Sequence, residues 1–141
     1  MTALTAPRLA TSQRDGVEFV RDVAADTVIF AGALVVLDAS GNAAPGSTAT
    51  GLIADGRAEE TADNTDGLAA AITVKVRRGV YRFENSASTE AITKAQIGDD
   101  CYIVDDQTVA KTNGDSGSGA TRSKAGRIED VDSVGVWVRI G

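Results

Sequence analysis

Few residues of this 141-residue chain have the types and spacing that catalysis or metal binding requires. The chain contains no histidine, which removes the usual general base near neutral pH and the serine or cysteine nucleophiles that depend on it. Cys101 is the only cysteine, so neither an intramolecular disulfide nor a thiolate cluster for zinc or iron–sulfur can form. Because Cys101 lies in an apolar run, we expect it to be a small core residue.

Three short motifs match the signatures of catalytic or nucleotide-binding sites only in part. Gly114-Asp115-Ser116-Gly117 has the letters of a serine-protease nucleophile segment, but that serine would have no imidazole base. Asp26-Thr27-Val28 lacks the glycine of the aspartic-protease turn, and Gly117-Ser118-Gly119 lacks the third glycine of a dinucleotide fingerprint. We therefore interpret all three as turns and loops.

Clustered carboxylates could hold calcium or share a proton. The loop Asp63-Asn64-Thr65-Asp66-Gly67 offers oxygen ligands but lacks the EF-hand spacing and its distal glutamate, which favours a solvated turn. The pairs Asp99-Asp100 and Asp105-Asp106 flank an expected strand, whose alternation points their carboxylates apart. We therefore expect no catalytic residues, no cofactor and no metal site, and we predict that the protein is not an enzyme.

Charge and hydropathy restrict the class of partner. Lys and Arg total 14 against 20 Asp and Glu, a net charge of −6 that is spread along the chain, and such a surface repels phosphate backbones. The one basic cluster, residues 75–78, is too short to be a nucleic-acid site. No apolar run approaches the roughly 20 residues that span a bilayer, and the first residues carry no export or lipidation signal. We expect neither a nucleic acid nor a membrane as partner, and no export.

The elements that must position any functional residue are predicted to be short strands. Residues 72–77 alternate apolar and polar side chains, whereas residues 33–37 are almost continuously apolar, as in a strand buried on both faces. In residues 17–23 the alternation is interrupted by Arg21, which favours an edge or rim strand. Residues 93–97 are the one helical candidate, with Gly98 as a plausible stop.

These patterns predict an all-β fold, a small β-barrel or compact β-sandwich over residues 17–141, with at most one short helix. Aromatic residues are only 4% of the chain, so its core must consist of Val, Ile, Leu and Ala. Residues 1–16 contain Pro7 and show no periodicity, and we expect them to form an extended N-terminal arm. Residues 113–120 are expected to be a loop rich in Gly and Ser.

Four segments resemble the capsid cement, or head decoration, proteins of tailed bacteriophages and related prophages. They are AGALV (31–35), VRRGVYRF (76–83), IGDDCYIVDDQTV (97–109) and AGRIEDVDSVGVWVRI (125–140). The resemblance implies a small β-barrel on the outer surface of the virion, made in the host cytoplasm, that clamps adjacent major capsid protein subunits. It also implies self-association, with a homotrimer favoured over a dimer.

We predict that the arm is the main capsid anchor. An extended segment can add a strand to an exposed sheet edge, which gains main-chain hydrogen bonds. Arg8 and Arg14 could pair with carboxylates of the capsid lattice, although exposed pairs contribute only about 0–1 kcal/mol each. The candidate capsid-binding residues are Thr5, Pro7, Arg8, Leu9 and Arg14.

Two alternatives remain open at this stage. A β-rich tail or baseplate attachment module would have a similar sequence. A lipoyl-like carrier barrel is suggested by the apolar hairpin around Gly32, but it needs a lysine at a hairpin tip. The sequence places no lysine convincingly at such a tip, whether Lys75, Lys94, Lys111 or Lys124.

Overall fold

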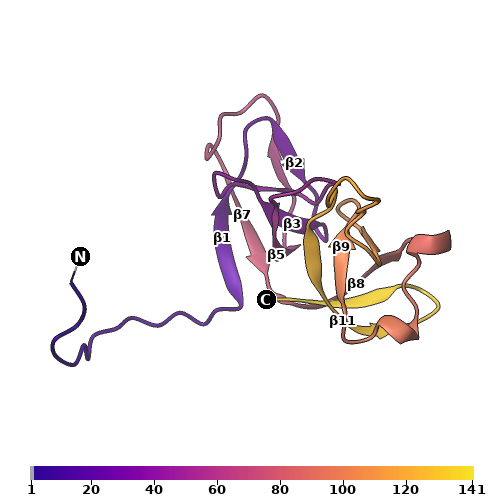
Figure 1. The fold of residues 1–141 in the computed structure, drawn as a ribbon. Helices are drawn as coiled ribbons and strands as arrows, with labels where there is room; N and C mark the ends of the chain where they lie inside the picture. Colours follow the sequence, from indigo (N-terminus) through magenta and orange to yellow (C-terminus); the bar gives the residue numbers. More distant parts are fainter. Residues whose placement is uncertain (1) are drawn as a thin grey trace.

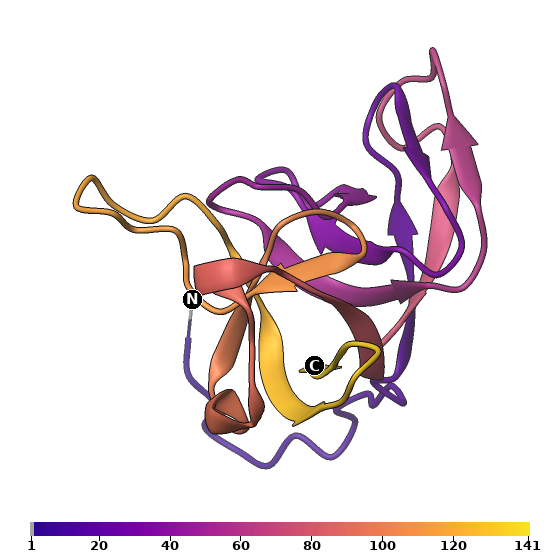
Figure 2. The ribbon, with the colours of Figure 1, turned by 90° about the vertical axis from the view of Figure 1, so that its right-hand side faces the viewer.

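The computed structural model describes residues 2–141 and consists mainly of β-strands, with 42% of the chain in strands and 4% in short helical turns. Figure 1 shows a body of sheets from which the N-terminal segment extends away, and Figure 2 shows the same body turned by 90°. The predicted all-β fold is therefore confirmed. Within the described part of the chain, no helix has the length and apolar character needed to cross a membrane.

The strands form three groups. An antiparallel sheet has the order β1-β7-β5-β3-β4, a closed barrel has the order β10-β8-β12-β11-β9, and β2 pairs with β6 in a two-stranded ribbon. In the barrel, β10 runs parallel to β8, and all the other pairs of neighbouring strands are antiparallel. The bounds are β1 Glu18–Asp22, β2 Thr27–Ile29, β3 Leu34–Leu37, β4 Ala43–Pro45, β5 Ile53–Ala58, β6 Ala62–Asn64, β7 Thr73–Arg77, β8 Gly79–Asn85, β9 Asp100–Ile103, β10 Thr108–Ala110, β11 Lys124–Val131 and β12 Val136–Ile140.

The apolar patterns predict how the strands are buried. In β7 the side chains of Val74 and Val76 are buried, and those of Thr73, Lys75 and Arg77 are exposed. In β3, Leu34 and Val36 belong to the barrel core, whereas Val35 belongs to the core under the open sheet. Strand β3 therefore contributes to both cores, and for this reason its sequence is apolar on both faces.

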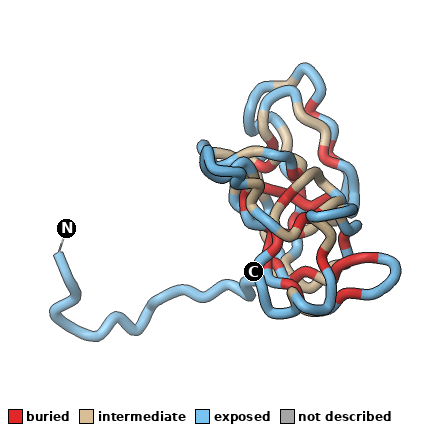
Figure 3. The backbone as a smooth tube through the Cα atoms, turned by 45° about the vertical axis from the view of Figure 1, so that its right-hand side comes forward, coloured by how far each residue is buried: buried red, intermediate tan, exposed pale blue. Residues whose placement is uncertain are grey.

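Both cores consist mostly of aliphatic side chains, as the composition predicts. Phe83 is the only aromatic residue among the buried hydrophobic residues of the described chain. Cys101 lies in the barrel core with no exposed surface, which confirms its interpretation as a small core residue. Figure 3 shows that the buried positions lie within the body, whereas the N-terminal segment is exposed.

Across residues 2–141, helical structure is limited to two single 3-10 turns, Ser88–Glu90 and Lys94–Gln96. The second coincides with the helix predicted over residues 93–97. Its first turn is capped by Thr93, whose hydroxyl accepts from the Ala95 amide and whose own amide donates to Gln96. The turn at residues 88–90 has no signal that we found in the sequence.

Arg78 alone separates β7 from β8, and there the chain crosses from the open sheet into the barrel. One local prediction changes in the structure. The loop predicted over residues 63–67 begins later, because Asp63 and Asn64 belong to β6. Asn64 is buried, and its amide donates to the carbonyls of Ala24 (2.9 Å) and Leu68 (3.0 Å). Pairing with β2 satisfies the backbone hydrogen bonds of this short strand. Local turn propensity alone does not indicate this pairing.

Candidate binding arm and its anchoring cluster

Residues 2–16 contain no strand or helix, and each of them is exposed. Leu4 is 73% exposed and Leu9 is 95% exposed, so neither leucine packs against the body. Within residues 2–16, the one internal side-chain hydrogen bond is local, from the Thr11 hydroxyl to the Arg8 carbonyl at 3.2 Å. Figure 1 shows this arm leaving the body at the start of β1.

The predicted capsid-binding residues lie in sequence along this arm and do not gather into a pocket. Thr5, Pro7, Arg8, Leu9 and Arg14 are all exposed. Within residues 2–141, neither Arg8 nor Arg14 forms an ion pair. The arm thus presents apolar and cationic side chains to any partner without first breaking contacts to its own body.

The arm continues directly into β1, which lies at the edge of the open sheet and pairs only with β7. This confirms the edge strand predicted from Arg21. Val20 in the same strand is 61% exposed. The outer side of β1 therefore offers unpaired backbone groups, continuous with the arm, to which a further strand can be added.

A buried ion cluster holds β1 where the arm begins. The Asp55 carboxylate is 2% exposed and accepts two hydrogen bonds from the Arg21 guanidinium, from Nε at 2.7 Å and Nη2 at 2.9 Å. Nη2 of Arg78 lies 3.4 Å from the same carboxylate. The hydrogen bonds to Asp55 raise the pKa of Arg21 above its ordinary value, so its charge is secure at every physiological pH.

A register shift in β5 places Asp55 in this position. Val35 of β3 is opposite Gly56 and Val36 is opposite Ala54, so Asp55 is the extra residue of a β-bulge. A bulge turns a side chain out of the regular alternation, and here it directs the carboxylate toward β1 and Arg78. A Cβ on Gly56 would lie 2.4 Å from the Arg77 carbonyl oxygen, so glycine is required where the two strands approach beside the bulge.

Phe19 completes the cluster. The guanidinium carbons of Arg21 and Arg78 each lie 4.6 Å from the centre of its ring, so both cations stack on one aromatic side chain. The Arg78 amide also donates to the Val17 carbonyl at 2.8 Å. These contacts fix the last residues before β1, and the point from which the arm leaves the body is therefore defined.

Sequence reasoning missed Asp55 and Arg78. A signal for Asp55 existed, since it is an ionisable residue between the apolar run 52–54 and Gly56. A buried charge needs a partner, and Arg21, already unexpected on the apolar side of its strand, was an available candidate.

Comparisons with protein-family models, with curated proteins and with solved structures find no match.

A second candidate surface lies around the Gly32 turn. It is concave and is lined by three of the six aromatic residues of the chain, Phe30, Tyr81 and Trp137, of which Phe30 is exposed and the other two are half-buried. The guanidinium of Arg57 stacks on Tyr81 at 4.5 Å and that of Arg82 lies 5.9 Å from the Trp137 ring. Aromatic residues and arginine are the side chains most enriched where protein interfaces gain their affinity, so this face is suited to a protein contact.

The motifs that partly matched chemical sites have structural contacts. Asp115 accepts hydrogen bonds from the Gly117 and Gly119 amides, which shapes the exposed loop over residues 113–120. Asp63 accepts from the Thr65 amide and hydroxyl, which holds its pKa below the usual value. In the described chain, no group of three or more His, Cys, Asp or Glu side chains is arranged to hold a metal ion.

Proposed function

We propose that the protein is a non-enzymatic structural protein of the virion that decorates the outside of a tailed-phage head. It stabilises the shell by binding adjacent major capsid protein subunits. The observation that carries this proposal is the exposed arm of residues 2–16 leaving an edge strand, β1, that the Arg21–Asp55 pair ties to β5. The sequence resemblance to head decoration proteins supports it independently.

The length of the arm suits a contact across a subunit boundary. Residues 2–16 extended at roughly 3.3 Å each span about 50 Å. Because the arm lies free of the body, binding costs the conformational entropy of ordering it, which limits the affinity of a single arm. Self-association offsets this limit, since several arms on one oligomer bind with a high effective concentration at neighbouring sites.

Self-association, with a trimer favoured over a dimer, is part of the proposal. Head lattices offer three-fold and quasi-three-fold sites, and a closed ring uses one pair of complementary surfaces in every subunit. The aromatic and arginine face around Gly32 is a surface of suitable chemistry. No nucleic acid, membrane, metal or cofactor enters this role.

Deletion of residues 2–14 tests the role of the arm. Expanded heads lacking the protein are mixed with the full chain, with the truncated chain, or with a chain whose arm has the same composition in scrambled order. Bound protein is then measured after sedimentation. We expect the truncated body to keep its thermal stability, because residues 2–14 do not contact it, while the affinity for heads falls at least about thirtyfold, or 2 kcal/mol.

A truncated chain that decorates heads as tightly as the full chain would show that the anchor lies on the body. Labelling of intact particles with antibodies against the protein separates a head location from a tail location. Label confined to tails would replace the proposal with the tail-attachment alternative.

A further inference from the structure

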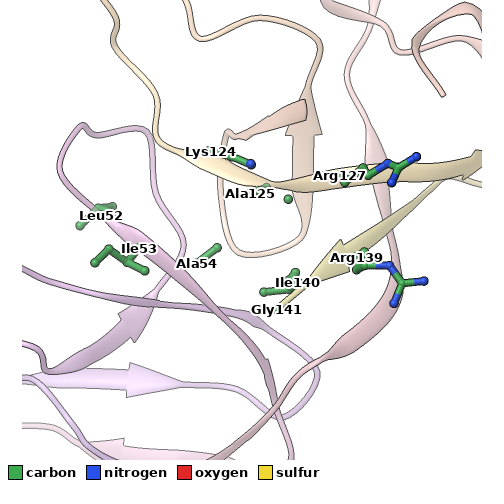
Figure 4. Close-up of a pocket in the computed structure, with 10 residues that line it drawn as sticks. Leu52, Ile53, Ala54, Lys124, Ala125, Arg127, Arg139, Ile140 and Gly141 are labelled. Carbon is green, nitrogen blue, oxygen red and sulfur yellow. The ribbon is translucent and has the colours of Figure 1, made fainter. Parts of the chain in front are cut away.

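An open groove with a volume of about 390 Å³ lies between the two halves of the body. One wall is the start of β5 with Leu52, Ile53 and Ala54, and the other is formed by β11 and the end of β12 (Figure 4). Ser123 joins the two walls, because its hydroxyl accepts from the Leu52 amide at 3.0 Å and donates to the Ala49 carbonyl at 2.8 Å. The groove is large enough for a few side chains of a ligand.

Both walls have backbone segments with a strand neighbour on one side only. Strand β5 pairs with β7 at Arg57 and Ala58, so residues 53–55 have β3 as their only neighbour. Strand β11 pairs with β12 from Arg127 onward, so Lys124 has β9 as its only paired strand, whereas Gly126 packs against the Arg139 backbone of β12. Main-chain groups beside the groove are therefore available to a segment that lies across it in extended form.

Charge is unevenly distributed along the groove. Arg127 and Arg139 are directly opposite each other on β11 and β12, an arrangement of like charges that destabilises a strand pair. Arg139 is partly neutralised by Glu129 at 2.8 Å, whereas Arg127 forms no ion pair with any residue in 2–141. Figure 4 shows the two guanidinium groups at one end of the groove and Leu52 and Ile53 at the other.

A large apolar side chain is also exposed to solvent at this site. Ile53 is 63% exposed although it lies in a strand, and it borders the groove. Lys124, at the rim, pairs with Asp100 at 3.1 Å but keeps more than half of its side chain exposed. A ligand that matches this groove carries negative charge at one end and an apolar side chain at the other.

We propose that the groove binds an extended acidic segment of a protein partner. A carboxylate of that segment pairs with Arg127 and Arg139, and an apolar side chain a few residues away covers Ile53, Ala54 and Ile140. The arm of a second copy is a poor occupant, because its Arg8 and Arg14 have the same sign of charge as the groove. The inference does not depend on the proposed function.

The groove lies next to the start of the arm. Gly141 lines the groove and contacts the Arg78 side chain, such that a Cβ on Gly141 would lie 2.9 Å from Cδ of Arg78. Arg78 in turn donates to Val17, where the arm leaves the body. A partner bound close to the start of the arm can therefore also contact the groove.

The test uses a blocked six-residue peptide with one aspartate two residues before an isoleucine, and the same peptide with asparagine instead. Each is titrated into the full ¹⁵N-labelled chain and followed by NMR. We expect the aspartate peptide to shift the amides of Ile53, Ala54, Gly126 and Arg127, with a Kd of about 1 mM, and the asparagine peptide to bind about tenfold more weakly.

Two variants and a control assign the site. Arg127→Gln should weaken the aspartate peptide to the level of the asparagine peptide and leave the asparagine peptide unchanged. Ile53→Ser should weaken both peptides. Lys75→Gln, which removes an exposed positive charge that does not line the groove, should change neither. Thermal melting confirms that each variant is folded.

Equal affinity for the two peptides, shifts confined to other surfaces, or no shift at 10 mM peptide (roughly ten times the expected Kd) would each overturn the groove assignment. Binding of the full chain and of the Arg127→Gln chain to expanded heads is measured separately. Arm-dependent binding to heads by a natural chain that does not bind the peptide would refute the groove and leave the proposed function standing. Peptide binding by a chain that does not bind heads would refute the proposed function and leave the groove standing.

Discussion

Replacement of Asp55 by asparagine tests whether the buried ion cluster holds the start of the arm. The carboxylate is 2% exposed, and its two short hydrogen bonds come from Arg21, whose side chain is 24% exposed. An amide has nearly the same shape, but it offers one acceptor and turns an N–H group toward a guanidinium that can only donate. The neutral variant therefore leaves Arg21 and Arg78 with an incomplete partner.

The magnitude follows from burial. Removal of one member of a fully buried pair costs about 3–5 kcal/mol, but both arginines here retain contact with water, which reduces the loss. We expect Asp55→Asn to lower the free energy of unfolding by about 2–3 kcal/mol, the range for a lost charge-assisted pair. For a domain of this size that corresponds to a fall in Tm of about 6–10 °C.

Thermal and urea unfolding followed by circular dichroism measure this change. Glu18→Gln is the matched control, because Glu18 is also a carboxylate paired with an arginine at β1, but at 3.9 Å and with both side chains about half exposed. It should cost no more than about 0.5 kcal/mol. A change of under about 0.5 kcal/mol for Asp55→Asn, which is the size of a typical surface substitution, would refute the assigned role of the cluster.

Two further predictions concern titrating groups. Burial raises the pKa of the Cys101 thiol to about 12. We therefore expect the thiol to stay unreactive toward a thiol reagent at pH 8 in the folded protein and to react promptly in urea. Rapid labelling of the native chain would contradict its burial. Hydrogen bonds from Thr112, with Arg122 at 3.1 Å, hold the pKa of Glu90 below its ordinary 4.5. A lowered folded pKa gives stability that is present above the unfolded pKa and lost as pH falls through the folded one. Glu90→Gln should therefore melt at a lower temperature than the natural chain at pH 7, with the gap narrowing toward pH 3, and a gap independent of pH would contradict this assignment.

Several features of the fold were predictable because they depend on local periodicity. The alternation in residues 72–77 and the apolar run in residues 33–37 each report whether one or both faces of a strand are buried. The exposure of the arm follows from its lack of any apolar period. Arg21 indicated an edge strand, since an ionisable group on the apolar side of a central strand would have no route to water.

The candidate sites were less accessible to sequence reasoning. The arm residues could be named in advance because they are contiguous. The Asp55 cluster joins residues on β1, on β5 and at the crossing between β7 and β8, and the groove joins β5 to β11 and β12. Each site depends on which strands become neighbours and on the shift of one residue in register, neither of which has a local signature in this chain.

The sequence by itself determined the class of fold, the aliphatic character of the core, the burial of Cys101 and the exposed arm. These properties follow from the composition and from a two-residue period, both of which are local. Only the tertiary structure decided that Val35 and its neighbours Leu34 and Val36 serve different cores, that Asp55 is turned toward Arg21 by a bulge, and that Arg127 is opposite Arg139. The physical reason is that each strand could form similar hydrogen bonds with many partners that are distant in the sequence. The packing of the whole body selects among these alternatives.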